Sequence, residues 1–337
     1  MDTIVKPNSA PDAPPAVAVE GLCIDVPAMG GSWRVVDDVS FAIPRGRVLG
    51  LVGESGSGKS LTGLTLNGLL AMTGARLAAG RVELAGRDVT GFDDAQWRPL
   101  RGAVASMVFQ DPLMSLNPVH RVGAQIVEAL IVHKGLSRRA AWDEAAQMLD
   151  AVGVPDAKRR ARSFPHQLSG GMRQRVGIAM ALACGPDLLI ADEPTTALDV
   201  TIQAQILALI DRMRRETGAA VLFISHDLSV ISQIADEVAV IYAGQIVEKA
   251  PVDRLFAAPE HPYTIGLLGS MPDLSLPEVP LVAIPGAVPP PGAMPAGCRF
   301  APRCPFATDA CRIARPPLRV VGPDHVAACI LVPVTAQ

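Results

Sequence analysis

The sequence lacks a charge imbalance of either sign. Its 337 residues include 30 Lys and Arg against 33 Asp and Glu, for a formal net charge of -3. A protein that binds nucleic acid along its surface carries a basic patch or an overall basic composition. The composition therefore gives no indication of a nucleic-acid partner, and we expect none.

Long hydrophobic runs are also missing, although 49% of the residues are hydrophobic. A membrane-spanning helix needs about 18 or more consecutive apolar residues. The most apolar tract, residues 176–191, is interrupted by Gly185, Pro186 and Asp187. Residues 1–16 contain prolines and charges but no apolar core of a signal peptide, which predicts a disordered tail. We therefore expect a soluble chain that stays in the cytoplasm.

Cysteines are few, and no two of them form a C-x2-C pair. The six lie at positions 23, 184, 298, 304, 311 and 329. In a reducing cytoplasm we do not expect them to form structural disulfides. Four of the six nevertheless fall in the last 40 residues, with the spacing C-x5-C-x6-C-x17-C. The absence of close pairs distinguishes this spacing from that of most zinc ribbons.

What is present is an alternation of short apolar runs and amphipathic segments. Residues 48–52 form an apolar run, a glycine-rich loop follows over 53–60, and residues 61–70 are apolar again. This order predicts a strand, a loop and a helix. Further strands are predicted over 16–26, 34–44, 81–84, 103–109, 188–191 and 220–224, and helices over 122–134, 138–152 and 204–217. Alternating strands and helices predict an α/β fold with a mainly parallel sheet covered on both faces.

The pattern of residue types changes along the chain and divides it into an α/β region, a proline-rich stretch and a C-terminal region with clustered cysteines. The alternating pattern occupies residues 17–260, and residues 111–184 within it are mainly helical. Prolines crowd residues 272–295, and regular periodicity ends there. We therefore predict a large α/β domain over 17–260 with a helical subdomain at about 111–184. A linker and a C-terminal extension over 261–337 carry the four clustered cysteines.

The glycine-rich loop matches the phosphate-binding pattern G-x-x-x-x-G-K-[ST] in full. Glycines at these positions let backbone N–H groups wrap around phosphates at a helix N-terminus, where the helix dipole favours negative charge. We expect Lys59 to reach the β- and γ-phosphates and the Ser60 hydroxyl to coordinate Mg²⁺. A glycine turn that merely precedes Lys-Ser is the alternative, which the flanking strand and helix disfavour. The expected nucleotide-binding residues are Gly53, Glu54, Ser55, Gly56, Ser57, Gly58, Lys59, Ser60 and Leu61.

Two acidic residues follow the predicted strand 188–191. Ligands of α/β sheets bind at the carboxyl ends of the strands, which is where Asp192 and Glu193 lie. Asp192 suits the surroundings of Mg²⁺, and Glu193 suits the polarisation of an attacking water. A helix cap uses the same residue types and is the alternative. A P-loop in the same sheet favours the catalytic interpretation.

A second glycine-containing helix start follows at Leu168, Ser169, Gly170 and Gly171. A serine and two glycines at a helix N-terminus can bind an anion, although on their own they are more often a helix cap. One P-loop already accommodates the nucleotide of this chain. We therefore infer that this segment serves a nucleotide held by another subunit.

These motifs, in this order and spacing, resemble those of the ATPase subunits of ABC transporters. The resemblance covers about residues 17–335 and includes the P-loop, residues 168–171, the acidic pair, residues 197–199 and residues 225–227. It implies an ABC-type P-loop NTPase domain that uses ATP and Mg²⁺. It further implies that Gln110 contacts Mg²⁺ and couples to the membrane subunits, that His226 contacts the γ-phosphate, and that Asp199 lies at a dimer seam.

Two positions depart from the family pattern. Met172 stands where many relatives have Gln, a change that the resemblance to peptide-type members accommodates. The aromatic residue that stacks on adenine is expected near Gly30 when counted back from Phe41, whereas the nearest aromatic is Trp33. Trp33 is the candidate for this contact, and a surface tryptophan beside glycines is the alternative.

The C-terminal extension resembles the tail of ATPases from dipeptide and oligopeptide importers. The similarity rests on His261-Pro262-Tyr263-Thr264, on Pro285-Gly286 and on residues 297–305. It implies that four thiolates hold a [4Fe–4S] cluster, with Zn²⁺ or metal-free thiols as alternatives. The four ligands would be Cys298, Cys304, Cys311 and Cys329.

The resemblance also implies a larger machine. Two ATPase subunits, expected to be different chains, would sandwich two ATPs. Two transmembrane permease subunits and an extracytoplasmic substrate-binding protein would complete an importer, with this chain at the cytoplasmic face of the bacterial inner membrane. Importers of glutathione, opines or nickel, an exporter, and a non-transport ABC ATPase acting on DNA or ribosomes are the alternatives. The cysteine tail could also be a redox sensor instead of a structural element.

Overall fold

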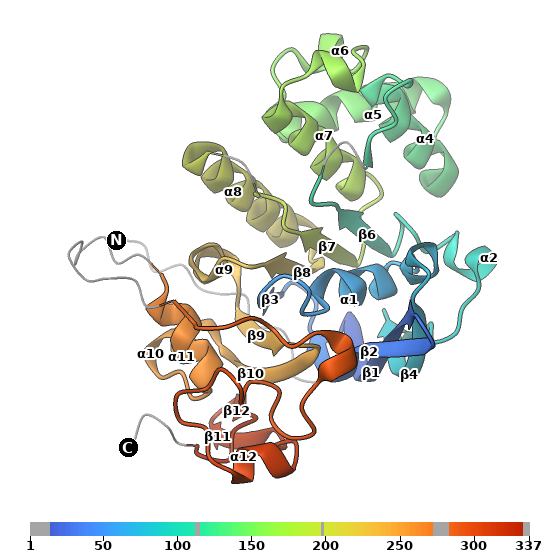
Figure 1. The fold of residues 1–337 in the computed structure, drawn as a ribbon. Helices are drawn as coiled ribbons and strands as arrows, with labels where there is room; N and C mark the ends of the chain where they lie inside the picture. The colour runs from blue at the N-terminus through green and yellow to red at the C-terminus, as the bar shows by residue number, and fades with distance from the viewer. Residues whose placement is uncertain (1–13, 112–114, 197–198, 272–282, 333–337) are drawn as a thin grey trace.

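The computed structural model describes residues 14–111, 115–196, 199–271 and 283–332. A lower lobe built on sheets carries an upper lobe of helices (Figure 1). Most of the expected tail, residues 1–13, lies outside the described residues. So do residues 112–114 after the predicted strand, residues 197–198 of the family pattern, and residues 272–282 of the proline-rich stretch.

An eight-stranded sheet forms the centre of the lower lobe, in the order β11-β12-β10-β9-β3-β8-β7-β6. The strands from β9 to β6 are parallel, and the three at the other edge are antiparallel. This parallel centre confirms the α/β prediction. The strands are β3 (Val48–Val52), β6 (Ala105–Val108), β7 (Leu188–Asp192), β8 (Ala220–Ser225), β9 (Glu237–Tyr242), β10 (Gln245–Pro251), β11 (Arg319–Gly322) and β12 (His325–Ala327).

Both faces of the parallel strands are buried, as their continuous apolar runs predict. In β3, Val48 and Val52 pack into the core shared with the helical lobe, whereas Leu49 and Leu51 pack into a second core on the opposite face. Burying a side chain of this size contributes about 1.5–3 kcal/mol. The strand is therefore held rigidly from both sides, and the loop that leaves its carboxyl end starts from a well-defined position.

A separate four-stranded antiparallel sheet covers one face of the lower lobe, in the order β2-β1-β4-β5. It consists of β1 (Val17–Ala28), β2 (Gly31–Ile43), β4 (Arg76–Leu84) and β5 (Arg87–Asp88). The prediction of one mainly parallel sheet omitted it. Only Met29 and Gly30 separate β1 from β2, and a connection of two residues permits antiparallel pairing alone. Gly30 has a φ of 84°, the left-handed conformation that such a turn requires.

Helices cover the parallel sheet and build the upper lobe. The helix predicted over 122–134 has these bounds in the structure, and α8 begins four residues before the prediction because Asp199 caps it. The helices are α1 (Lys59–Leu66), α2 (Asp94–Trp97), α4 (Val122–Lys134), α5 (Arg138–Ala151), α6 (Ala157–Arg160), α7 (Gly170–Leu182), α8 (Val200–Thr217), α9 (Leu228–Ile234), α10 (Val252–Ala257), α11 (Pro262–Gly269) and α12 (Ala310–Ile313), with 3-10 turns η1 (Leu70–Thr73), η2 (Pro165–Gln167) and η3 (Pro291–Ala293).

Within the described residues, the helices are too short or too polar for any of them to cross a lipid bilayer.

The C-terminal segment continues the main sheet. Strand β12 pairs with β10, and the fully buried Glu248 on β10 joins the two. Its carboxylate accepts hydrogen bonds from the backbone N–H of Glu260 (2.8 Å) and of His261 (2.9 Å), and lies 2.7 Å from Nε2 of His325 on β12. Buried carboxylates need such partners. The C-terminal segment is thereby anchored to the nucleotide-binding lobe.

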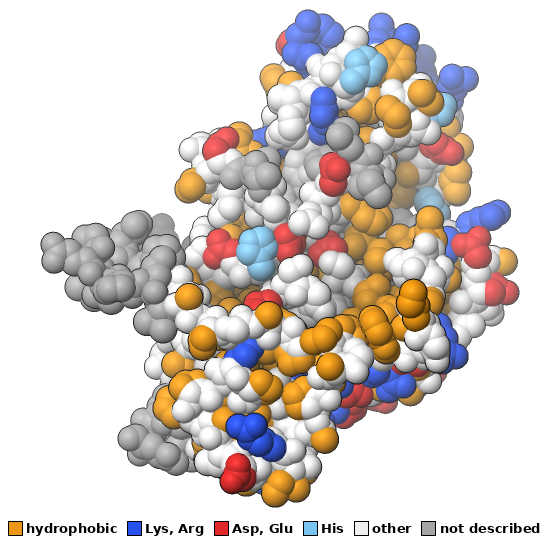
Figure 2. Space-filling model, viewed as in Figure 1, with side chains coloured by type: hydrophobic (Ala, Val, Ile, Leu, Met, Phe, Trp, Pro, Cys, Tyr) orange, Lys and Arg blue, Asp and Glu red, His pale blue; other side chains and the backbone are white. Residues whose placement is uncertain are grey.

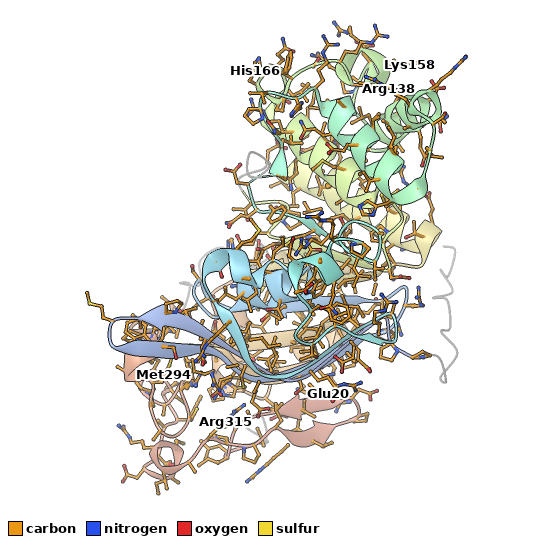
Figure 3. All side chains as sticks on the ribbon, turned by 90° about the vertical axis from the view of Figure 1, so that its right-hand side faces the viewer. Glu20, Arg138, Lys158, His166, Met294 and Arg315 are labelled. Atoms are coloured by element: carbon orange, nitrogen blue, oxygen red, sulfur yellow. The ribbon has the colours of Figure 1, made fainter. Side chains whose placement is uncertain are left out.

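This segment lies at the opposite end of the molecule from the helical lobe. Figure 3 shows Arg138, Lys158 and His166 at the outer end of the helical lobe and Met294 and Arg315 at the other end. Any effect of the C-terminal segment on a site in the lower lobe must therefore pass through direct contacts there.

Candidate active site

The P-loop leaves the end of β3 and enters α1 as the sequence predicts. A Cβ at Gly53 would lie 2.1 Å from the carbonyl oxygen of Ile241, so a larger residue cannot occupy that position. Gly58 has a φ of 97° immediately before α1. The loop is thus wound tightly around the N-terminus of α1, which is the arrangement that presents backbone N–H groups to phosphate.

Lys59 is buried inside this loop. Its ammonium group donates hydrogen bonds to the carbonyl oxygens of Gly53 (2.6 Å) and Glu54 (3.0 Å). Burial lowers the pKa of Lys59, and neighbouring carboxylates, Glu193 first, oppose that change. A cation held among carbonyl oxygens within a phosphate-binding loop is positioned to bind an anionic ligand.

Two oxygen groups suited to coordinate Mg²⁺ lie next to each other at the carboxyl edge of the sheet. The Ser60 hydroxyl on α1 lies 3.2 Å from Oδ1 of Asp192 at the end of β7, and Asp192 is buried. Burial raises the pKa of Asp192, and the charge of Glu193 adds to this effect. A divalent cation would offset that penalty. Because Mg²⁺ prefers hard oxygen ligands and is usually held by few protein groups, the pair fits the expected site.

Glu193 is the centre of a second polar cluster. Its Oε2 accepts hydrogen bonds from Nε2 of Gln110 (3.0 Å) and from the Thr196 hydroxyl (2.9 Å), and its Oε1 lies 3.1 Å from Nδ1 of His226. Gln110, Glu193 and His226 follow the adjacent strands β6, β7 and β8. The structure therefore brings these three predicted residues together. Thr196 was missed, although its spacing of three residues from Glu193 allows the contact.

The backbone and charge of Glu193 are both constrained. Glu193 has a φ of 47°, a conformation that non-glycine residues adopt at some energetic cost and that is concentrated at functional sites. Burial raises the pKa of its carboxyl, but the hydrogen bonds from His226 and Thr196 outweigh this, so the pKa lies below its ordinary value. Glu193 is therefore a carboxylate near neutral pH, able to accept a hydrogen bond from water.

The surface view agrees with this geometry. Figure 2 shows one histidine side chain flanked by acidic side chains in the region between the two lobes. The His226 side chain is 57% exposed, whereas the Glu193 side chain that it contacts is 15% exposed. A ligand that approaches from this side meets the imidazole before it meets the carboxylate.

The segment Leu168–Gly171 lies elsewhere in the molecule. Its helix α7 belongs to the upper lobe, whereas the P-loop lies at α1 in the lower lobe (Figure 1). The Ser169 hydroxyl accepts a hydrogen bond from the backbone N–H of Met172 (3.3 Å) and caps the helix. Gln174 donates from Nε2 to the carbonyl oxygen of Pro194 (2.7 Å), which connects α7 to the residue after Glu193. Asp199 caps α8 by accepting from the Ile202 N–H (2.9 Å).

Trp33 lies on β2, opposite Val26, and is 44% exposed. A Cβ at Gly292 would lie 3.1 Å from Cε2 and Nε1 of the indole, so η3 of the C-terminal segment covers part of this ring. The remaining exposed surface can receive a flat ligand. Its role in adenine binding stays a prediction.

The four C-terminal cysteines line one small pocket together with His261, Pro262 and Pro316. Burial raises the pKa of Cys298, of Cys329 and of Cys304, the last to about 11. Backbone N–H groups point at the sulfur atoms, among them that of Leu331 at 3.4 Å from Cys329 Sγ. In the described residues, however, no three His, Cys, Asp or Glu side chains are grouped closely enough to hold a metal ion.

The comparisons with known proteins agree with this geometry. A family model described as ABC transporter matches residues 36–196, and one described as the C-terminal region of oligopeptide/dipeptide transporters matches residues 247–311. A putative peptide import ATP-binding protein of Brucella abortus is 49% identical over 327 residues, covering 94% of this chain and 97% of that protein. The oligopeptide transport ATP-binding protein OppD of Salmonella typhimurium is 46% identical over 311 residues, with 92% of each chain covered.

Solved structures show the same fold. An ATP-binding cassette solved as a dimer in a post-hydrolysis state with ADP and Pi is 26% identical, with a TM-score of 0.62 over 70% of this chain and 98% of that one. CbiO1 from Clostridium perfringens, part of an ABC transporter complex, gives a TM-score of 0.61 at 25% identity, over 73% of this chain and 92% of that one. The fold and the site thus define an ATP-hydrolysing cassette. The chain belongs to the ABC transporter family, as an ATP-binding subunit of the oligopeptide/dipeptide type.

Proposed function

We propose that this chain hydrolyses ATP to drive peptide import as one ATPase subunit of an ABC importer. The observation that carries the proposal is the convergence of Gln110, Glu193 and His226 beside the P-loop, in a chain whose residues 247–311 match the peptide-transporter C-terminal region. Import of another small solute, such as glutathione, an opine or nickel, is the second candidate. It is weaker because the relatives above are named for peptides.

In the proposed mechanism, the P-loop amides and Lys59 bind the phosphates of ATP, and Ser60 and Asp192 would hold Mg²⁺. When bound, the metal offsets the negative charge on the phosphoryl oxygens. Glu193 accepts a hydrogen bond from the attacking water and takes up its proton as the water oxygen bonds to Pγ. The bond from Pγ to the ADP oxygen breaks with its electron pair left on ADP, and the proton leaves with the phosphate product. His226 is exposed beside Glu193, where it can donate to a γ-phosphate oxygen. Gln110 links this cluster to the helical lobe.

We further propose the assembly that this geometry requires. Leu168–Gly171 and Asp199 lie in or beside the upper lobe, so they would complete the nucleotide site of a second ATPase subunit, and Trp33 would stack on adenine. Residues 17–260 would form the nucleotide-binding domain, with the helical subdomain at about 111–184 and the extension at 261–337. The complete importer would add two permeases and an extracytoplasmic binding protein, with this chain at the cytoplasmic face of the membrane and in a heterodimer.

The test of transport is affinity purification of the tagged full chain from native membranes solubilised in mild detergent, followed by mass spectrometry. Recovery of two multi-span permeases and a second ATPase would support the importer. Recovery of ribosomal or DNA-bound proteins without permeases would leave the ATPase site intact and refute transport. A parallel preparation with Glu193→Gln, held with ATP, should retain the second ATPase more strongly, because closure without hydrolysis is not followed by opening.

The four C-terminal cysteines are also proposed to hold a [4Fe–4S] cluster. A single zinc ion bound by the same thiolates, with Zn–S bonds of about 2.3 Å, is the alternative. A cluster spans a wider ring of thiolates, and backbone N–H groups directed at sulfur are among the features that tune such clusters. The proposal rests on the resemblance to peptide-importer ATPases and on the thiols of Cys298, Cys304, Cys311 and Cys329 lining one pocket.

The cluster is tested on anaerobically purified full-length protein. Acid-labile sulfide and broad absorbance near about 400 nm should be present. Both should be lost in Cys311→Ser and retained in Cys184→Ser. Cys184 follows the end of α7 and is more than 100 residues from the pocket cysteines in the sequence. Protein that contains zinc instead of sulfide would contradict the proposal, and so would protein that contains neither. Comparing the ATPase rates of oxidised and reduced protein distinguishes two roles for the cysteines. A redox sensor would change the rate, whereas a structural element would leave it unchanged.

A further inference from the structure

The C-terminal segment contacts the P-loop directly, through one residue of the loop. Glu54 follows the first glycine of the loop, and both its backbone and its side chain have partners from the C-terminal segment. The backbone N–H of Glu54 donates to the Tyr263 hydroxyl (2.9 Å) on α11. Its two carboxylate oxygens lie 3.0 and 2.9 Å from Nη1 of Arg303. The loop is therefore clamped by residues 209 and 249 positions further along the chain.

Arg303 is held firmly for this contact. Its side chain is 5% exposed, and its Nε donates to the carbonyl oxygen of Pro285 (2.8 Å). Its guanidinium lies 5.7 Å from the ring centre of Tyr242 and 6.0 Å from that of Phe300, within the range of cation–π attraction. A buried, immobilised guanidinium has already lost its side-chain entropy, so its interaction with Glu54 is stronger than that of a surface ion pair.

Tyr263 is equally constrained. It is fully buried, and its ring lies 4.6 Å from that of Tyr242 and 5.4 Å from that of Phe300. Phe300 lies between Cys298 and Cys304 in the sequence, and Arg303 directly precedes Cys304. The two side chains that hold the P-loop are therefore sequence neighbours of residues that line the cysteine pocket, Pro262 before Tyr263 and Cys304 after Arg303.

The negative charge of Glu54 explains why its contacts with Arg303 and Tyr263 matter for nucleotide binding. Glu54 is an acidic residue inside a loop that must bind a polyanion, and its charge acts on Lys59 at the centre of that loop. An unpaired carboxylate there would repel the phosphates of ATP. Arg303 neutralises it, and the Tyr263 hydroxyl fixes the backbone at the same residue.

We propose that Arg303 and Tyr263 are positioning residues for ATP binding, through which the C-terminal segment sets the affinity of the P-loop for nucleotide. The role concerns binding of ATP and not the chemical step, since neither residue contacts the Glu193 cluster in the described structure. It rests on the ATPase activity and is independent of whether the chain imports peptides or carries a cluster.

The test compares Arg303→Met with wild type in the full chain, by equilibrium binding of a fluorescent ATP analogue and by steady-state hydrolysis. The dissociation constant and KM for ATP should rise about tenfold, with kcat changed less than about twofold, because a charge next to the phosphates acts in the ground state and the transition state alike. Arg303→Lys, which keeps the charge, should recover part of the loss. Tyr263→Phe, which removes one oxygen and keeps the ring, should raise KM by a smaller factor.

The decisive variant is the double substitution Arg303→Met with Glu54→Gln. If repulsion by an unpaired Glu54 causes the loss, removing that charge should bring KM back to within about threefold of wild type, although the clamp is still absent. The matched control is Arg214→Met, because Arg214 is also largely buried but pairs with Asp211 and Asp236, at the end of the parallel strands opposite the P-loop. Its KM should stay within about twofold of wild type once thermal unfolding shows it folded.

An unchanged KM in Arg303→Met would overturn the proposal. So would a double variant with a KM as high as that of Arg303→Met, since the defect would then be general disruption of the fold. Loss of kcat with no change in KM would also contradict it.

Discussion

The carboxylate of Glu193 and the imidazole of His226 lie 3.1 Å apart, although they follow different strands and are 33 positions apart in the sequence. The contact forms because β7 and β8 are parallel neighbours that end at the same edge of the sheet. It places a hydrogen-bonded carboxylate beside an exposed imidazole. The chemistry of the site depends on this arrangement more than on either residue alone.

Substitution of Glu193 by Gln should abolish most hydrolysis while ATP still binds. The amide keeps the size of the side chain but loses the negative charge that attracts the proton of water, an effect of about 10²–10⁴-fold in rate. The measurement is phosphate release at saturating ATP, alongside nucleotide binding. Glu237→Gln, which alters a half-buried pair with Lys249, serves as the control. Hydrolysis at the wild-type rate would remove Glu193 from the mechanism.

Replacement of Lys59 by Ala should weaken binding of ATP itself. The ammonium group inside the loop is then missing, and a charge-assisted hydrogen bond of this kind is worth about 10- to 100-fold in affinity. Equilibrium binding of ATP measures the change. Lys134→Ala removes a lysine that pairs with Glu144 in the helical lobe and should bind ATP normally. Equal affinity in the two variants would contradict the phosphate role of Lys59.

Removal of the Ser60 hydroxyl or of the Asp192 charge should change the requirement for Mg²⁺. Ser60→Ala deletes the hydroxyl, and Asp192→Asn removes the charge of the carboxylate that lies 3.2 Å from it. The Mg²⁺ concentration for half-maximal hydrolysis should rise by about 10- to 100-fold, as for other groups that orient a metal. Titration of activity with Mg²⁺ at fixed ATP tests this. Ser232→Ala on the surface of α9 is the matched hydroxyl control, and a Mg²⁺ requirement the same as in that control would argue against the assigned site.

Acid should destabilise the fold through His261. This side chain is completely buried, and burial lowers its pKa to about 3 from 6.5. Its neutral ring accepts a hydrogen bond from the Tyr263 N–H (3.1 Å) and caps α11. Because the folded pKa lies below the unfolded one, this contribution to stability is complete above about pH 6.5. It is lost as the pH falls from there towards 3, at about 1.4 kcal/mol per pH unit.

The test is denaturant unfolding of wild type and His261→Asn between pH 7.5 and pH 5. Asparagine can cap the helix but does not titrate in this range. The variant should lose about 2 kcal/mol less stability than wild type over the interval. His166→Asn, at an exposed position, should follow the wild type. Parallel curves for wild type and His261→Asn would show that His261 is not linked to folding.

Much of the nucleotide site could be predicted from the sequence because its parts are local. The P-loop is eight consecutive residues, Gly53–Ser60, whose function depends on backbone N–H groups and on one lysine. Gln110, Glu193 and His226 each follow a short apolar strand, and the carboxyl ends of parallel strands meet at one edge. Their mutual distances and the left-handed backbone of Glu193 came only from the structure.

Other features could not be predicted because they join distant segments. Arg303 and Glu54 are 249 positions apart, and the sequence pattern around Arg303 pointed to its neighbouring cysteines. Thr196 was passed over because a threonine has no distinctive pattern. The antiparallel sheet that contains β1 and β2 was missed because its pairing depends on the two-residue turn at Met29 and Gly30. The alternation of strands and helices in the rest of the chain pointed to parallel pairing.

By itself the sequence determined the phosphate-binding loop, the acidic pair and the parallel strands, because consecutive residues encode backbone conformation, burial pattern and ligand type. Tertiary structure alone decided which side chains meet. Folding placed Arg303 and Tyr263 against Glu54 and gathered three strand ends around Glu193. The physical reason is that contacts across the sheet arise from packing of the whole core, to which residues far apart in the chain contribute together.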